Sequence, residues 1–141
     1  MSIHVVVPNY EISKFEIQDP YQRCLHEDCV FVVEDHKITV FEGFWWNGAS
    51  IPRLLWTGVG SPFTGAYVVP TILHDLLYLI QIFDRKKTDD IFYYMNKTCG
   101  LSFIKNQTIY RGVRIGGWAS YNSVTDIMKE SAKKHCKVEK I

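Results

Sequence analysis

The residues best suited to chemistry lie close together in the stretch PTILHDLLYLIQIFDRKKTDDIFYYM. His74 and Asp75 stand side by side in an apolar run, and Asp89 and Asp90 follow after a short polar connection. An imidazole held by a carboxylate has a fixed tautomer and can act as a general base. A buried carboxylate is costly when unpaired, so Asp75 is expected to meet a cation, a metal or several hydrogen-bond donors.

Two predicted helices position these groups. A helix is expected over Pro70–Ile82, because proline suits the first turn and the run is apolar nearly all round. A second helix is expected over Lys87–Cys99, with Gly100 as its C-terminal stop. The short connection between them favours antiparallel packing.

The helical spacing decides which groups can meet. His74 and Tyr78 are four residues apart and share a face, whereas Asp75 points about 100° away. Antiparallel packing is expected to bring Asp89 within hydrogen-bond distance of His74 or Tyr78.

Asp75, on its own side of the helix, is a candidate ligand for a hard cation. Calcium takes six to eight oxygen ligands, mostly from carboxylates and backbone carbonyls. The upstream segment WTGVGSPFTG could supply those carbonyls, with Gly58 and Gly60 as candidates. Calcium is therefore the expected cofactor if there is one. A structural network that holds the helices together, with no metal and no catalysis, is the other interpretation of the same residues.

The segment WWNGASIP carries the candidate ligand-binding residues Gly48 and Ser50. Glycine allows a close approach of the backbone to a carboxylate or ion, so this turn is expected beside the N-terminal end of the His74 helix. Its tryptophans either cover the core or form the wall of a pocket. Ser50 is disfavoured as a nucleophile, because no histidine or aspartate lies at a recognisable local spacing.

Two arginines and two of the four cysteines each have more than one possible function. Arg111 and Arg114 share a helix face and either neutralise the aspartates or bind an anionic ligand. Cys24 and Cys29 lie near His26, but their spacing does not match a paired zinc site, so free thiols are favoured.

The composition excludes several classes of protein. The chain has 141 residues, of which 47% are hydrophobic and 22% charged, so it can bury a core. Its formal net charge of +1 argues against binding nucleic acid through bulk charge. The sequence predicts no transmembrane helix and no signal peptide.

The order of the predicted elements favours the α+β class. One domain is expected over residues 1–141, with a β-rich part at 1–42, a loop rich in glycine and aromatic residues at 43–65 and a helical part at 66–137. The fold would be a small N-terminal antiparallel sheet followed by a packed helical hairpin and one or two further helices. The expected strands are His4–Val7, Ser13–Ile17, Val30–Glu34 and Lys37–Phe41, and the further helices are Asn106–Trp118 and Val124–Lys137.

Four ordered motifs carry a resemblance to a known family. NGASIPRLLW, HDLLY, TDDIFYYM and YRGVRIGG resemble the pattern of a domain-of-unknown-function family from phages and bacteria. The resemblance runs from about Gly43 to Trp118. It implies a phage-type protein in a host cytoplasm or a virion, with no established activity.

A weaker resemblance extends to phospholipases that cleave the sn-2 ester, in particular the viral type. Their HDxxY helix is similar to His74, Asp75 and Tyr78, with Asp89 on the packed helix. The resemblance implies that His74, Tyr78 and Asp89 are catalytic, that Asp75 binds calcium with Gly58 and Gly60, and that the substrate is a lipid or another ester. The alternative is a noncatalytic virion or accessory protein that binds a phage or host protein.

Overall fold

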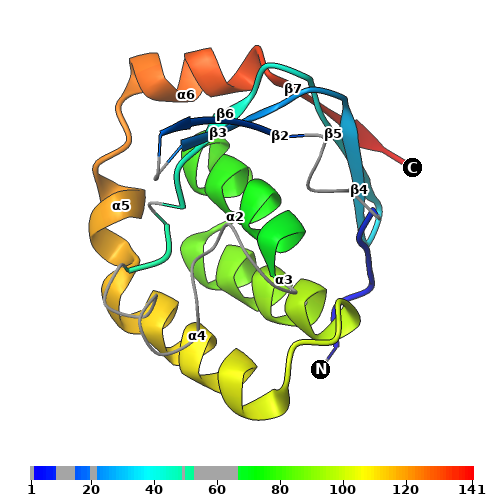
Figure 1. Ribbon diagram of the computed structural model, residues 1–141, viewed down its shortest axis with the longest axis vertical. Coiled ribbons are helices and arrows are strands. Elements are labelled where there is room, and N and C mark those ends of the chain that lie inside the picture. The colour runs from blue at the N-terminus through cyan, green and yellow to red at the C-terminus, as the bar shows by residue number, and fades with distance from the viewer. Residues whose placement is uncertain (1, 9–14, 20–21, 49, 53–66) are drawn as a thin grey trace.

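The computed structural model describes residues 2–8, 15–19, 22–48, 50–52 and 67–141. Antiparallel sheets from the N-terminal part lie over a group of helices, with α2 (Val68–Ile80) and α3 (Arg85–Thr98) at the centre (Figure 1). The chain is therefore α+β, with its sheets before its helices, as the sequence predicts.

One sheet has four strands. Their order across the sheet is β1 (Val5–Val6), β4 (Cys29–Val33), β5 (His36–Val40) and β7 (Cys136–Lys140). The expected strands Val30–Glu34 and Lys37–Phe41 correspond to β4 and β5. They form a hairpin whose tip pairs Val33 with His36 and holds Glu34 in the left-handed region at φ 52°. Alternate residues of β4 are buried, so this sheet presents one apolar face to the helices.

The other sheet leads the chain toward the candidate site. It consists of β2 (Phe15–Asp19), β3 (Gln22–Leu25) and β6 (Trp45–Trp46). The expected Ser13–Ile17 strand corresponds to β2, whereas β3 and β6 had no clear signal because each is only a few residues long. Strand β6 pairs with β3 and ends just before Gly48.

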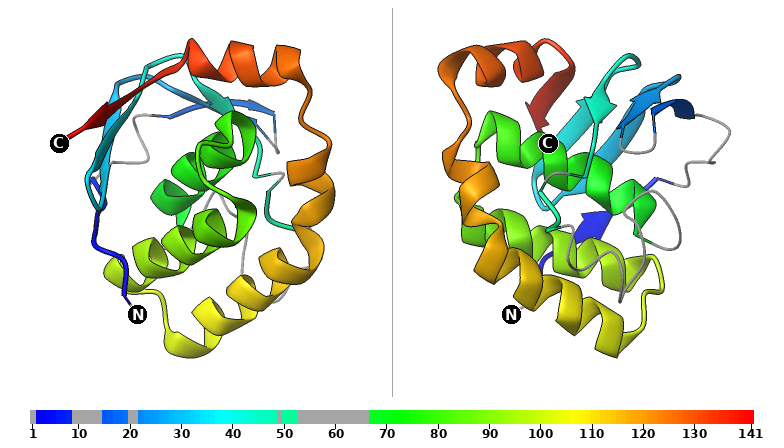
Figure 2. Two further views of the ribbon diagram at one scale, coloured as in Figure 1. Left: turned by 180° about the vertical axis from the view of Figure 1, so that it is seen from behind. Right: turned by 60° about the vertical axis from the view of Figure 1, so that its left-hand side comes forward.

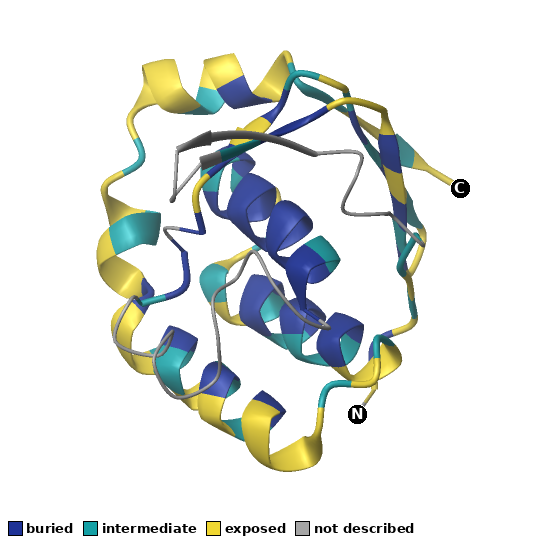
Figure 3. Ribbon diagram, in the orientation of Figure 1, coloured by how far each residue is buried: buried dark blue, intermediate teal, exposed yellow. Residues whose placement is uncertain are grey.

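Helix α2 is the centre of the core. Its side chains are buried on almost every side, and Leu73, Leu76 and Leu77 have no exposed surface (Figure 3). The helix ends at Gln81, which adopts the left-handed conformation at φ 53°. Asp84 then caps α3 by accepting a hydrogen bond of 2.7 Å from the backbone N–H of Lys87, so the two helices form the expected hairpin.

Three further helices follow one another around one side of the α2–α3 pair (Figure 2). They are α4 (Phe103–Gly116), α5 (Trp118–Asn122) and α6 (Asp126–Lys133). Helix α4 packs on α3, and α6 packs on α2. None of the helices in the described ranges has the length and apolar character that a membrane crossing requires.

The expected helix Val124–Lys137 is wrong at its C-terminal end. The helix stops at Lys133, and Cys136–Lys140 is the edge strand β7, in which Val138 pairs with Ile38 of β5. The free edge of β5 offers backbone partners to this segment, and that pairing outweighs the helical propensity of its lysines.

The junction of α4 and α5 lies directly over Tyr78. Gly117 has an ordinary helical backbone at φ −76°, so an alanine there would carry no backbone strain. A Cβ at this position would nevertheless overlap the Tyr78 hydroxyl and lie 3.3 Å from the ring carbon that bears it. Gly117 is therefore needed for close packing against the site.

We expect Gly117→Ala to lower the free energy of unfolding by about 1–3 kcal/mol, because the added methyl must displace Tyr78 or α5. Ala119→Ser, at an exposed position of the same short helix, is the control and should stay within about 0.5 kcal/mol of the wild type. Urea denaturation of the two variants measures both values. Equal stability of Gly117→Ala and the control would contradict the close packing.

Candidate functional site

The loop after β6 is fastened to the middle of α2 through Asp75. The carboxylate accepts hydrogen bonds from the backbone N–H of Gly48 at 2.8 Å, from the backbone N–H of Ser50 at 3.4 Å and from the Ser50 hydroxyl. Gly48 has φ 69°, a left-handed conformation that glycine adopts without strain. The structure thus brings Gly48 and Ser50 to Asp75, at the helix centre instead of near its N-terminus.

His74 is clamped from both sides. Its Nδ1 lies 2.8 Å from the Ser50 Oγ, and its Nε2 lies 2.8 Å from Asp89 Oδ1. The imidazole has no exposed surface and packs against the rings of Tyr78 and Phe92. The centroid of each of these rings lies 4.4 Å from the centroid of the imidazole. The expected contact between His74 and Asp89 is therefore present, and both ring nitrogens have partners.

Asp89 is the most heavily bonded group of the site. Its Oδ1 also accepts a hydrogen bond from the Tyr78 hydroxyl at 2.7 Å, and its Oδ2 accepts from Arg114 at 2.7 Å and Arg85 at 3.4 Å. Burial alone would raise the pKa of Asp89, but the hydrogen bonds from His74, Tyr78 and Arg114 lower it below its ordinary value. Asp89 is thus a buried carboxylate held in its charged form.

Arg85 is a site residue that the sequence analysis missed. It donates to the backbone carbonyls of Val113 and Arg114 at 3.0 and 3.1 Å, which ties the start of α3 to the end of α4. The signal was its position four residues before Asp89 on one helix face.

The two predicted arginines separate in the structure. Arg114 reaches Asp89, whereas Arg111 is exposed on the outer side of α4. Asp90 lies outside the network as well, since it pairs with Lys86 at 2.7 Å and accepts a hydrogen bond from Tyr110 at 2.5 Å.

The hydrogen bonds determine which nitrogen of His74 carries a proton. Ionised Asp89 can only accept, so His74 must carry a proton on Nε2. Ser50 has one hydroxyl proton but lies between two potential acceptors, His74 Nδ1 and Asp75 Oδ1. Burial raises the pKa of Asp75, against the opposing effect of its hydrogen bonds from Ser50 and Gly48. The Ser50 hydroxyl donates to Asp75 Oδ1, and the same proton can turn toward a bare Nδ1 of His74.

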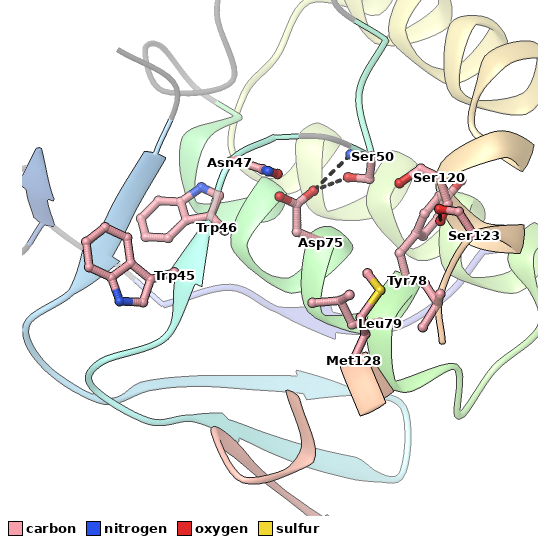
Figure 4. A pocket seen from close by; sticks show the side chains of 11 residues that line it. Trp45, Trp46, Asn47, Ser50, Asp75, Tyr78, Leu79, Ser120, Ser123 and Met128 are labelled. Atoms are coloured by element: carbon pink, nitrogen blue, oxygen red, sulfur yellow. Dashed lines mark hydrogen bonds between the residues drawn. The ribbon is translucent and has the colours of Figure 1, made fainter. Parts of the chain in front are cut away.

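A cavity of about 300 Å³ lies beside this network (Figure 4). Ser50, Asp75 and Tyr78 form part of its wall, while His74 lies behind them in the core. Trp45 is 43% exposed at this cavity, and Trp46 is buried. The remaining lining residues are Asn47, Leu79, Ser120, Ser123, Val124 and Met128. They come from β6, α2, α5 and α6, so no local sequence pattern could have grouped them.

The described residues that contact Asp75 do not fit calcium. The groups that point at its carboxylate are N–H and O–H donors, whereas calcium requires oxygen ligands such as carbonyls. In the described part of the chain, no three His, Cys, Asp or Glu side chains are grouped as a metal site would need. Gly58 and Gly60, the other predicted calcium ligands, lie outside the described residues.

The adjacent residues Asp89 and Asp90 give a matched test of the network. We expect Asp89→Ala to lower the free energy of unfolding by about 3–5 kcal/mol, because it leaves Arg114 and His74 without their buried partner. Asp90→Ala removes a partly exposed ion pair and should cost less than about 1 kcal/mol. Chemical denaturation compares the two, and similar losses would contradict the central position of Asp89.

The lowered pKa of Asp89 also predicts a pH dependence. Its contribution is present in full above the unfolded pKa of about 3.9 and is lost as the pH falls through the lower folded pKa. The difference in unfolding free energy between wild type and Asp89→Asn should therefore be large at pH 7 and shrink below about pH 4. Denaturation curves at several pH values measure this difference. A difference that does not change with pH would contradict an ionised Asp89.

Comparison with known proteins identifies relatives without an assigned activity. A protein from Sinorhizobium fredii (strain NBRC 101917 / NGR234), named "Uncharacterized protein y4jT", is 32% identical over 71 residues, which is 50% of this chain and 21% of that protein. The chain thus spans about a fifth of that relative's length. No solved structure gives a significant match. The family model described as "Protein of unknown function (DUF1353)" matches residues 24–113, which include every described member of the buried network except Arg114. The chain belongs to the DUF1353 family of proteins of unknown function.

Proposed function

We propose that the protein is a hydrolase of lipids or other esters, with Ser50 as the nucleophile. The observation that carries this proposal is the continuous run of hydrogen bonds from Ser50, at the cavity wall, through His74 to Asp89. A nucleophile bonded to a base that is oriented by a carboxylate is the arrangement of serine hydrolases on unrelated folds. Here Ser50 contacts Nδ1 and the carboxylate contacts Nε2.

The burial of His74 argues for Ser50 as the attacking group instead of water. A water molecule activated by His74 would need a free ring nitrogen, but Nδ1 is bonded to Ser50 and Nε2 to Asp89. Ser50 therefore takes the place of the water molecule that the phospholipase resemblance implied. The donor set around Asp75 fits this arrangement better than a calcium site, and no step below requires a metal ion.

The reaction follows from the positions of the protons. Ser50 Oγ attacks the ester carbonyl while its proton moves to His74 Nδ1, and the imidazolium is stabilised by Asp89. His74 then gives this proton to the departing alkoxide, which leaves as the alcohol. The acyl group remains bonded to Ser50. Water attacks the acyl group, His74 takes a proton from the water and returns it to Ser50, and the carboxylic acid is released.

The cavity favours a substrate with an apolar part. Trp45, Leu79, Val124 and Met128 offer apolar surface, and about 300 Å³ is at the small end of the range for small-molecule sites. The side-chain amide of Asn47 lines the same cavity and is the type of donor that stabilises a tetrahedral oxyanion. The backbone N–H groups of Gly48 and Ser50 are already bonded to Asp75.

We expect wild-type protein to hydrolyse p-nitrophenyl esters of short or medium chain and to react covalently with a fluorophosphonate probe at Ser50. Ser50→Ala should abolish labelling and lower kcat by about 10³-fold or more, since the nucleophile is lost. Ser131→Ala, at an exposed position outside the cavity, is the control. A chelator of calcium should leave turnover unchanged. Peptide mapping of the labelled protein identifies the site, and labelling elsewhere or no labelling would contradict the proposal.

A noncatalytic function is the second candidate, and a specific observation favours it. His74 has no exposed surface and all its hydrogen bonds are internal, as expected for a network that only pins the loop to the helices. The protein would then be an interaction module, for example a phage virion or accessory component. Three results together would support this function over the hydrolase. Ser50 would not react with the fluorophosphonate probe, the protein would not hydrolyse esters or phospholipids, and Ser50→Ala would lose much of its stability.

A further inference from the structure

Helix α4 carries large apolar side chains on the side that points away from the protein. Its buried residues Asn106, Ile109 and Val113 face the core. Ile104 and Ile115 are each 78% exposed. Because they are eleven positions apart, they lie within about 20° of each other around the helix axis, on the side opposite Ile109 and Val113. The outer side of α4 therefore carries an exposed isoleucine near each end, with the polar residues Thr108 and Arg111 between them.

Two more large apolar side chains are exposed close to the two ends of α4. Phe103, at the start of α4, is 71% exposed, and Trp118, at the start of α5, is 57% exposed. Figure 3 shows the outer side of α4 as exposed along its length. Single exposed apolar residues are normal on soluble proteins, but four in the stretch 103–118 mark an interaction surface. We call Phe103, Ile104, Ile115 and Trp118 the α4 outer face.

The charges around this face have one sign. Residues 103–122 contain Lys105, Arg111 and Arg114 but no aspartate or glutamate. Arg114 is bound to Asp89. Lys105 and Arg111 are exposed, and neither forms an ion pair with a described residue. Arg111 lies four residues before Ile115, so a cation without an ion-pair partner among the described residues stands beside Ile115 on this side of the helix.

We propose that the α4 outer face binds the surface of an anionic lipid membrane. Isoleucine, phenylalanine and tryptophan side chains insert at the boundary between headgroups and acyl chains, while arginine and lysine bind the phosphates. A row about 16 Å long on one side of a helix can lie flat on such a surface. The inference rests on α4 and α5 alone, and it holds whether or not Ser50 is a nucleophile.

A second copy of the chain fits this face less well. A two-fold symmetric contact would bring the same patch of each copy together and place the Arg111 and Lys105 side chains of both copies near one another. No acidic residue of the same stretch is available to offset that repulsion. Anionic phosphates supply the missing negative charge.

The experiment is co-sedimentation of the wild-type protein with vesicles. We expect binding to vesicles of phosphatidylcholine with about 30% phosphatidylglycerol, whose negative surface attracts basic side chains, and weak binding to phosphatidylcholine alone. Ile104→Ser with Ile115→Ser should reduce the partition coefficient about tenfold or more. Arg111→Glu with Lys105→Glu should do the same.

The controls change the same residue types elsewhere on the surface. Ile127→Ser replaces an isoleucine of α6 that is 83% exposed, and Lys134→Glu reverses an exposed charge near the end of α6. Both controls should bind vesicles as the wild-type protein does. Binding should also shift the tryptophan emission to shorter wavelength, and Trp118→Phe should remove that shift.

Three results would overturn the proposal. One is the absence of binding to both vesicle compositions. Another is binding that the paired substitutions on α4 leave unchanged. The third is concentration-dependent dimerisation that disappears in the Ile104→Ser, Ile115→Ser variant, measured by light scattering, which would assign the α4 outer face to a second copy of the chain.

Discussion

The buried charge of Asp89 is the constraint on which the rest of this structure depends. Burying a charged carboxylate away from water costs free energy unless hydrogen-bond donors or cations surround it. Here the donors come from α2, α3 and α4, in the form of His74, Tyr78, Arg85 and Arg114. The positions of three helices are therefore linked through one side chain, and the close approach of Gly117 to Tyr78 belongs to the same arrangement.

The hydrogen bond between Asp89 and His74 also connects the core to the cavity. Because Asp89 fixes the proton on Nε2, it leaves Nδ1 of His74 to face Ser50. Asp75 holds Ser50 from the other side and fastens the loop by its backbone. A network that only stabilised the fold could end at His74. This one continues to a hydroxyl at the wall of a cavity, which is why we favour a catalytic function.

The sequence predicted the parts of this arrangement that depend on local pattern. The α2–α3 hairpin follows from helical periodicity and a short connection, and the meeting of His74 with Asp89 follows from that hairpin. Ser50 was disfavoured as a nucleophile because its partner is 24 positions away and is reached only through tertiary packing. The change to strand after Lys133 was missed because the free edge of β5, not a local pattern, determines it. Arg111 and Arg114 share a helix, yet only one of them turns inward.

The tautomer of His74 tests the central claim most directly. Nitrogen-15 NMR of protein labelled at histidine, with His74→Gln to assign the signals, distinguishes a protonated ring nitrogen from a bare one. Near neutral pH the account predicts a neutral imidazole with the proton on Nε2 and a bare Nδ1, and Asp89→Asn should disturb this state. A proton on Nδ1 would contradict the account, because Ser50 would then have no base to receive its proton.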